Sequence, residues 1–126
     1  MKTLILSLIL AASALAQQVI TTTIAASGSL SAAVSVTGCT LAAIEMPVWT
    51  ATNLTFQVSN DGITYTDFYD DFNTEVLVTT THTTTARTIR LSAGDWWSVR
   101  YIKVRSGISA TPVAQAAART IKLICR

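Results

Sequence analysis

The sequence carries little charge. Only 13% of its 126 residues are Asp, Glu, Lys or Arg, and the net charge at pH 7 is +2. Nucleic-acid-binding domains usually have a much higher pI and a concentrated basic stripe, so the composition argues against a nucleic-acid partner. The acids lie between Glu45 and Asp95, whereas all bases except Lys2 lie from Arg87 onward. In a compact β fold this separation predicts acidic and basic strands on different surfaces.

The sequence also lacks the short motifs of common enzyme classes. It contains no G-x-S-x-G, Walker or H-E-x-x-H pattern. The single histidine, His82, has no second histidine, cysteine or carboxylate at ligand spacing. We therefore expect no enzyme activity and no catalytic residues.

Helical periodicity is missing as well. After Gln17, apolar residues recur with a period of two and not at helical spacing. Turn residues divide the chain into eight or nine short predicted strands, at 19–25, 29–36, 40–46, 54–60, 64–69, 75–81, 85–91, 99–106 and 119–125. This pattern predicts an all-β fold, an antiparallel β-sandwich or jelly roll. Only "VAQAAAR", residues 113–119, has helical propensity.

The strongest local signal is the stretch "LTFQVSNDGITYTDFYDD", which predicts a β-hairpin. Its first run alternates apolar and polar residues, and Asp61–Gly62 then supplies a tight turn, because glycine accepts a positive φ. On the return strand Tyr65 and Phe68 break the alternation, which predicts a bulge near Asp67.

The N-terminal segment, residues 1–16, reads as a signal peptide. Lys2 precedes a short apolar run, and Ala14–Ala16 fits the small-x-small cleavage rule, so the predicted cut precedes Gln17. The alternative is an uncleaved apolar arm that packs against a neighbouring subunit. Residues 17–126 contain no repeat and no linker, and are predicted to form a single domain.

Cysteine is scarce, with only Cys39 and Cys125. In an exported protein they are expected to form one disulfide that closes a loop of about 85 residues. In a reducing cytoplasm they would be small core residues. The sequence leaves both possibilities open.

Four acids lie close together in the chain, around a predicted loop: Asp67, Asp70, Asp71 and Glu75. Oxygen ligands at such spacing are candidates for a calcium site, although the pattern is not an EF-hand loop. Such a cluster more commonly forms a solvated acidic loop without a metal ion. We therefore expect no metal or other cofactor, with calcium as the alternative.

Three tryptophans are candidates for a subunit interface or for stacking on a ligand. Trp96 and Trp97 are adjacent, so on a strand they cannot both point inward, and one is predicted to be exposed. Exposed tryptophan suits a sugar or a protein partner. Trp49 is the third candidate.

Two stretches carry a resemblance to a known family: "MPVWTATNLTFQVSNDGITYTDFYDD" and "VRYIKVRSGISATPVAQAAARTIKL". They resemble small β-sandwich proteins of tailed bacteriophages and prophages, which are head-decoration, fibre, neck or tail components of the virion. The resemblance extends over roughly residues 19–126 and implies no enzyme activity. A weaker likeness, to discoidin and galactose-binding sandwiches, is limited to the hairpin around Asp61–Gly62.

The sequence therefore predicts a non-enzymatic structural protein, a phage or prophage virion subunit. Its expected partners are copies of itself and other virion proteins, and its expected location is the virion. The alternative is a secreted or periplasmic carbohydrate-binding or adhesive module, with a glycan as its ligand.

Overall fold

The structure is a computed structural model, which describes residues 17–50, 52–80 and 84–126. In these ranges the chain forms strands and one short 3-10 helix, with no α-helix. The elements are β1 (Gln18–Ile24), β2 (Val34–Ser35), β3 (Leu41–Met46), β4 (Leu54–Ser59), β5 (Thr66–Asp67), β6 (Arg87–Arg90), η1 (Ala93–Trp96), β7 (Tyr101–Ile108), β8 (Thr111–Pro112) and β9 (Arg119–Cys125). No helix in the described ranges has the length and apolar character needed to cross a membrane. The segment 1–16 and His82 lie outside the described residues.

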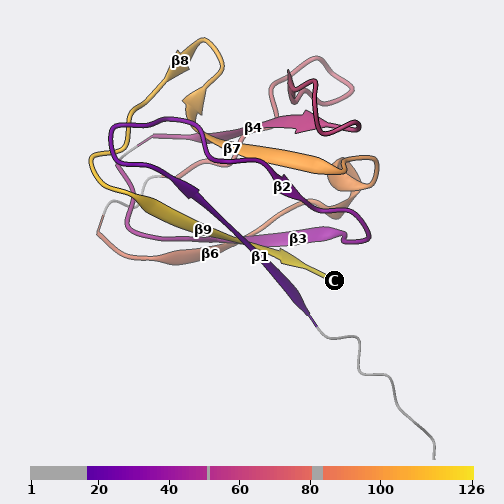
Figure 1. Ribbon diagram of the computed structural model, residues 1–126, viewed down its shortest axis with the longest axis horizontal. Helices are drawn as coiled ribbons and strands as arrows, with labels where there is room; N and C mark the ends of the chain where they lie inside the picture. Colours follow the sequence, from indigo (N-terminus) through magenta and orange to yellow (C-terminus); the bar gives the residue numbers. More distant parts are fainter. Residues whose placement is uncertain (1–16, 51, 81–83) are drawn as a thin grey trace, which may run out of the picture.

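The strands form two antiparallel sheets packed against each other (Figure 1). One sheet has the order β1-β9-β3-β6, and the other has the order β2-β7-β4-β5 with β8 beside β7. Apart from the β4–β5 and β7–β8 hairpins, every strand lies in the opposite sheet from the strand before it. This alternation gives the interlocked Greek keys of a jelly roll. The predicted antiparallel sandwich of jelly-roll type is confirmed.

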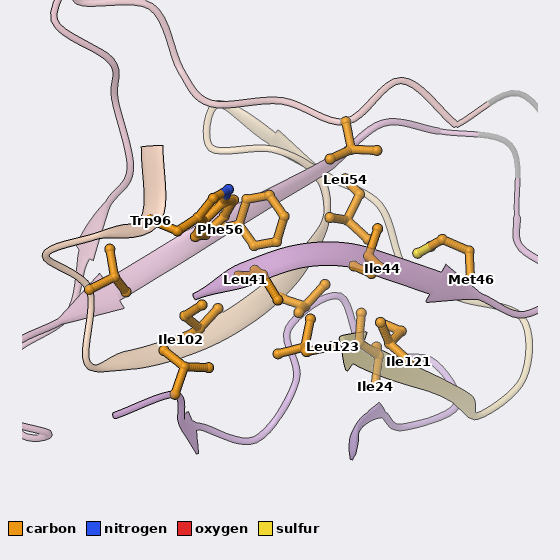
Figure 2. Close-up of a cluster of buried hydrophobic side chains, with 14 of the residues drawn as sticks. Ile24, Leu41, Ile44, Met46, Leu54, Phe56, Trp96, Ile102, Ile121 and Leu123 are labelled. Carbon is orange, nitrogen blue, oxygen red and sulfur yellow. The ribbon is translucent and has the colours of Figure 1, made fainter. Parts of the chain in front are cut away.

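The hydrophobic core lies between the two sheets (Figure 2). Side chains at alternate positions of the strands point inward, as the period of two requires. On β9, for example, Ile121 and Leu123 are fully buried while Lys122 between them is exposed. Each buried aliphatic side chain stabilises the fold by roughly 1.5–3 kcal/mol. The core members that Figure 2 labels are Ile24, Leu41, Ile44, Met46, Leu54, Phe56, Trp96, Ile102, Ile121 and Leu123.

The β4–β5 hairpin confirms the turn but not the bulge. Gln57 pairs with Asp67 in regular register, and the Phe68 amide donates to the Phe56 carbonyl at 3.1 Å. Tyr65 and Phe68 lie on opposite faces of the sheet. Phe68 packs against Trp96 in the core, whereas the Tyr65 ring has the Lys103 ammonium 4.2 Å from its centroid. The two aromatics need no shared face, so no bulge is required.

Two other expectations were wrong. Residues 75–80 form no strand and make only isolated bridges, Glu75 with Tyr69 and Val78 with Leu54. Most of the predicted strand at 29–36 is likewise irregular, and only Val34–Ser35 belongs to a sheet. Alternation reports which side chains are buried, but it does not require that neighbouring backbone groups pair along the whole run.

Residues 113–119 form no helix, contrary to their propensity. Gln115 is buried, and its amide oxygen accepts hydrogen bonds from the Thr50 amide at 2.9 Å and from Arg119 Nε at 3.2 Å. Its backbone also bonds to Ser27 and Gly28. These long-range bonds hold the segment open, because a helix would direct the same backbone groups into its own turns.

Candidate functional site

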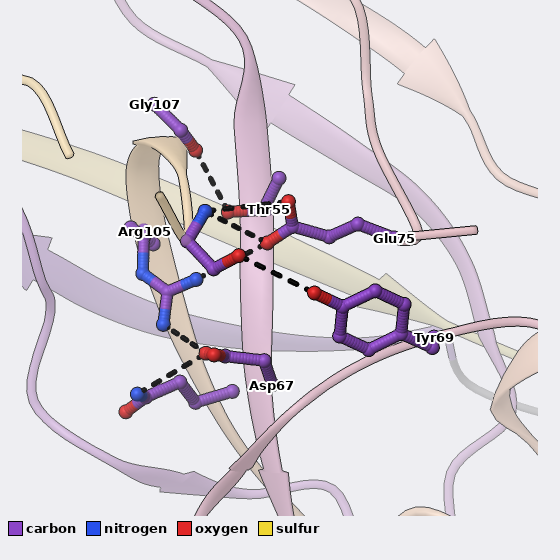
Figure 3. Close-up of polar contacts among 8 residues, drawn as sticks. Thr55, Asp67, Tyr69, Glu75, Arg105 and Gly107 are labelled. Atoms are coloured by element: carbon purple, nitrogen blue, oxygen red, sulfur yellow. Dashed lines mark hydrogen bonds and ion pairs between the residues drawn. The ribbon is translucent and has the colours of Figure 1, made fainter. Parts of the chain in front are cut away.

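The four acids considered for calcium do not converge. Asp67 and Glu75 both form ion pairs with Arg105, whose side chain is only 6% exposed (Figure 3). Arg105 Nη1 lies 3.2 Å from Glu75 Oε1, which also accepts the Ser109 amide at 2.9 Å. This buried cation takes the place that a metal ion would occupy between the two carboxylates.

The remaining two acids have other surroundings. Asp70 accepts the Phe72 and Thr74 amides at 2.9 and 2.8 Å, and so closes the loop of residues 70–74 on itself. Asp71 is exposed. In the described part of the chain, no three His, Cys, Asp or Glu side chains gather where they could hold a metal ion. The acidic cluster in the sequence therefore consists of an ion-pair network around the buried Arg105 and a capped loop.

Cys39 and Cys125 form a disulfide, with Cα atoms 5.3 Å apart. The bond joins the loop after β2 to the end of β9. Beside it, the backbones of Thr40 and Arg126 exchange hydrogen bonds of 3.3 and 3.1 Å. The disulfide, one of the two alternatives that the sequence left open, is the one present in the structure.

Two of the three tryptophans are buried. Trp49 is 1% exposed and Trp96 is 2% exposed, so neither offers a surface to a partner. Trp96 packs edge-on against Phe56, with ring centroids 4.7 Å apart. Trp97, the next residue, is 80% exposed. The expected division between an inward and an outward tryptophan is present, although it occurs at the end of a 3-10 helix and not on a strand.

Trp97 lines a groove at the end of the sandwich where β7 begins. The groove has a volume of about 740 Å³, within the range of roughly 300–1,000 Å³ typical of small-ligand sites. Its walls come from the loop between β2 and β3, the end of β4, and the segment between η1 and β7. The lining residues are Val36, Thr37, Gly38, Cys39, Thr40, Asn60, Trp97, Ser98, Val99 and Arg100.

One edge of this groove is shaped by the β4–β5 turn. Asp61 Oδ1 accepts hydrogen bonds of 2.8 Å from the amides of Ile63 and Thr64 and from the hydroxyl of Ser59. The backbone bonds from Ile63 and Thr64, followed by the Ser59 bond, lower the pKa of Asp61 from 3.8 to about 2. The carboxylate is thus turned toward its own loop, and Asn60 alone of this turn lines the groove.

Three side chains, two on the surface and one buried, were missed by sequence reasoning. Ile63 and Phe72 are the most exposed large apolar residues of the described chain, at 85% and 83%. Both belong to turns that contain aspartates, and from the sequence only the roles of these acids were considered. The buried Arg105 was missed because nothing in "VRYIKVRS" marks which of its three basic residues lies under a loop.

Comparisons with protein-family models, with curated proteins and with solved structures give no match for this chain.

Proposed function

We propose that the chain is a non-enzymatic structural subunit of a phage or prophage virion, such as a capsid decoration, fibre or tail component. It acts by self-association and by contacts with other virion proteins. The jelly-roll fold supports this proposal, since capsid domains commonly use it. The resemblance of residues 46–71 and 99–123 to virion proteins of tailed phages points the same way.

The observation that carries the proposal is the pair of apolar side chains on ordered loops. Ile63 and Phe72 are 85% and 83% exposed. Each follows an aspartate whose side chain accepts two backbone amides of the loop, Asp61 in the first case and Asp70 in the second. The first loop directly follows β4, and the second follows β5, which runs antiparallel to β4.

A large apolar side chain on a loop that is held in place is suited to a protein contact. Its burial against a partner removes apolar surface from water, at roughly 25 cal/mol per Å². Little conformational entropy is lost on binding, because the loop is already ordered by its aspartate. Aromatic and aliphatic anchors of this kind commonly form the centre of protein interfaces.

Size-exclusion chromatography with light scattering tests the self-association. We expect the full chain to form oligomers that become monomers in the double variant Ile63→Ser/Phe72→Ser. The matched control is Val48→Ser/Leu77→Ser, which removes two apolar residues that are 40% and 41% exposed and should leave the oligomer intact. A wild-type chain that stays monomeric at every concentration would reject self-association through these loops.

The virion assignment has its own test. We expect mass spectrometry of phage particles induced from the source cell to contain peptides of the chain in stoichiometric amounts. Finding the chain only in the medium or periplasm, separate from particles, would count against it.

A second function is favoured by a specific observation. The groove beside Trp97 suits a secreted or periplasmic carbohydrate-binding module, and the Cys39–Cys125 disulfide is typical of proteins in oxidising compartments. The two functions differ in location and in the surface that they use.

A further inference from the structure

The groove beside Trp97 combines an exposed aromatic side chain on a fixed backbone with a cation, Arg100, that forms no ion pair among the described residues. The segment that carries Trp97 is held from both sides, because Trp96 before it and Val99 after it are buried, at 2% and 8% exposure. The Val36 amide also donates to the Arg100 carbonyl at 2.8 Å. Trp97 therefore presents its indole from a backbone that the core fixes, and ligand binding does not have to order that backbone.

The part of the lining that contains Cys39 is fixed as well. Cys39 lines the groove and is bonded to Cys125 at the end of β9. Its amide donates to the Val36 carbonyl at 3.1 Å. A groove whose walls are held in this way loses little conformational entropy when a ligand enters, which favours specific binding.

Several polar side chains of the groove have no partner among the described residues, although the Thr37 hydroxyl accepts a hydrogen bond from Ser35 at 3.1 Å. The side chains of Asn60, Ser98 and Arg100 form no hydrogen bond to any part of the chain that the structure describes, and Arg100 forms no ion pair there. The lining contains no carboxylate side chain. Asp61, the acid that follows Asn60 in the sequence, is engaged by its own turn.

These features together select a chemical class of ligand. An exposed indole stacks on the apolar face of a pyranose ring, while hydroxyl and amide groups bond to its hydroxyls. A guanidinium without an ion pair matches a carboxylate in a two-pronged geometry. We propose that the groove binds an acidic oligosaccharide, with one ring stacked on Trp97 and a sugar carboxylate paired with Arg100. This inference extends the second candidate function and does not depend on the assembly role.

A glycan array that holds acidic sugars beside their neutral counterparts tests the proposal. We expect the full chain to bind acidic members, such as oligogalacturonates. Their methyl esters should bind at least about tenfold more weakly. Trp97→Ala should abolish binding to both forms. Arg100→Gln should remove the preference for the acid and leave the weak binding of the ester.

The control for charge is Lys103→Gln, which removes a cation that lies outside the groove, over the Tyr65 ring. It should bind the array as the wild type does. The proposal is overturned by the absence of any glycan signal, by equal binding of acids and esters, or by a signal that survives Trp97→Ala. An equal loss in Lys103→Gln would also overturn it, since that result indicates general attraction to positive charge. The variant Ile63→Ser/Phe72→Ser retains the groove, so a failure of assembly and a failure of glycan binding remain distinguishable.

Discussion

Removal of the disulfide should destabilise the fold by a large fraction of its total stability. Cys39 and Cys125 are 86 residues apart in the sequence, so the bond restricts most of the unfolded chain. The loop-closure relation gives about 4 to 5 kcal/mol at 25 °C for a loop of this length. Small domains are typically stable by only about 5–15 kcal/mol. The double variant Cys39→Ala/Cys125→Ala should therefore be close to the limit of stability.

Urea denaturation followed by tryptophan fluorescence measures this loss, since Trp49 and Trp96 are buried and report on the core. We compare the oxidised wild type, the reduced wild type and the double variant. The reduced wild type and the variant should both lose several kcal/mol in the free energy of unfolding. Reductant should not change the stability of the variant, because the variant has no disulfide. This control distinguishes loss of the bond from other effects of the reductant.

A loss below about 1 kcal/mol in the variant would refute the reasoning. That result would mean either that the unfolded chain is already compact without the bond, or that the bond strains the native fold. The unfolding slope distinguishes these two cases, because it scales with the surface exposed on unfolding. If the unfolded variant is compact, its slope stays close to that of the oxidised wild type, whereas native strain with an expanded unfolded chain gives the variant a larger slope.

Three further predictions concern single positions. Gly107 has φ +88°, and an added Cβ would lie 2.5 Å from the Thr111 carbonyl oxygen, whereas Gly38 has φ +76° and open space. In urea denaturation, Gly38→Ala should lower the free energy of unfolding by about 1–2 kcal/mol and Gly107→Ala by at least about 3 kcal/mol. Equal losses for the two variants would contradict the predicted clash. Arg105→Leu leaves the Glu75 carboxylate, 14% exposed, without its cation, and should lower the free energy of unfolding by about 3–5 kcal/mol. The double variant Arg105→Leu/Glu75→Leu removes the uncompensated charge and should recover part of this loss. No recovery in the double variant would contradict the explanation. Asp61, with its pKa lowered to about 2, stabilises its turn above pH 3.8, and this contribution is lost as the pH falls toward 2. The NMR shift of the Ile63 amide should titrate with its midpoint at the folded-state pKa, about 2, and Asp61→Asn, which keeps the accepting oxygen, should abolish the titration.

The parts of the fold that the sequence predicted are those decided by local chemistry. The last strand, Arg119–Cys125, has its predicted bounds because three apolar residues alternate with exposed or half-buried ones along its whole length. The β4–β5 turn was predictable because Asp61–Gly62 supplies both a side-chain acceptor and a positive φ, here +75°. Each of these signals lies within a few residues of the structure that it specifies.

The parts that could not be predicted depend on contacts between distant residues. The segment around Gln115 has helical propensity, but Gln115 bonds to Thr50, 65 residues away. The acids at 67 and 75 read as a possible ion site until Arg105, 38 and 30 residues further on, is placed between them. Helix propensity contributes little free energy per residue, so several long-range hydrogen bonds together override it.

The two ends of the sandwich also differ in a way that only the structure reveals. At the end opposite the groove, the Gln115 side chain bonds to the Thr50 amide, the Ser106 hydroxyl and Arg119, so the polar atoms of the Gln115 side chain are used within the fold. At the groove end, the walls are held by a disulfide and by backbone bonds, and the side chains of Asn60 and Arg100 have no hydrogen-bond partner in the part of the chain that the structure describes. A buried polar group that lacks a partner is costly, so one end has been closed by internal bonding. The groove end is the one where a ligand can bind side chains that the fold does not already use, because substitution of Asn60, Ser98 or Arg100 breaks no side-chain hydrogen bond among the described residues.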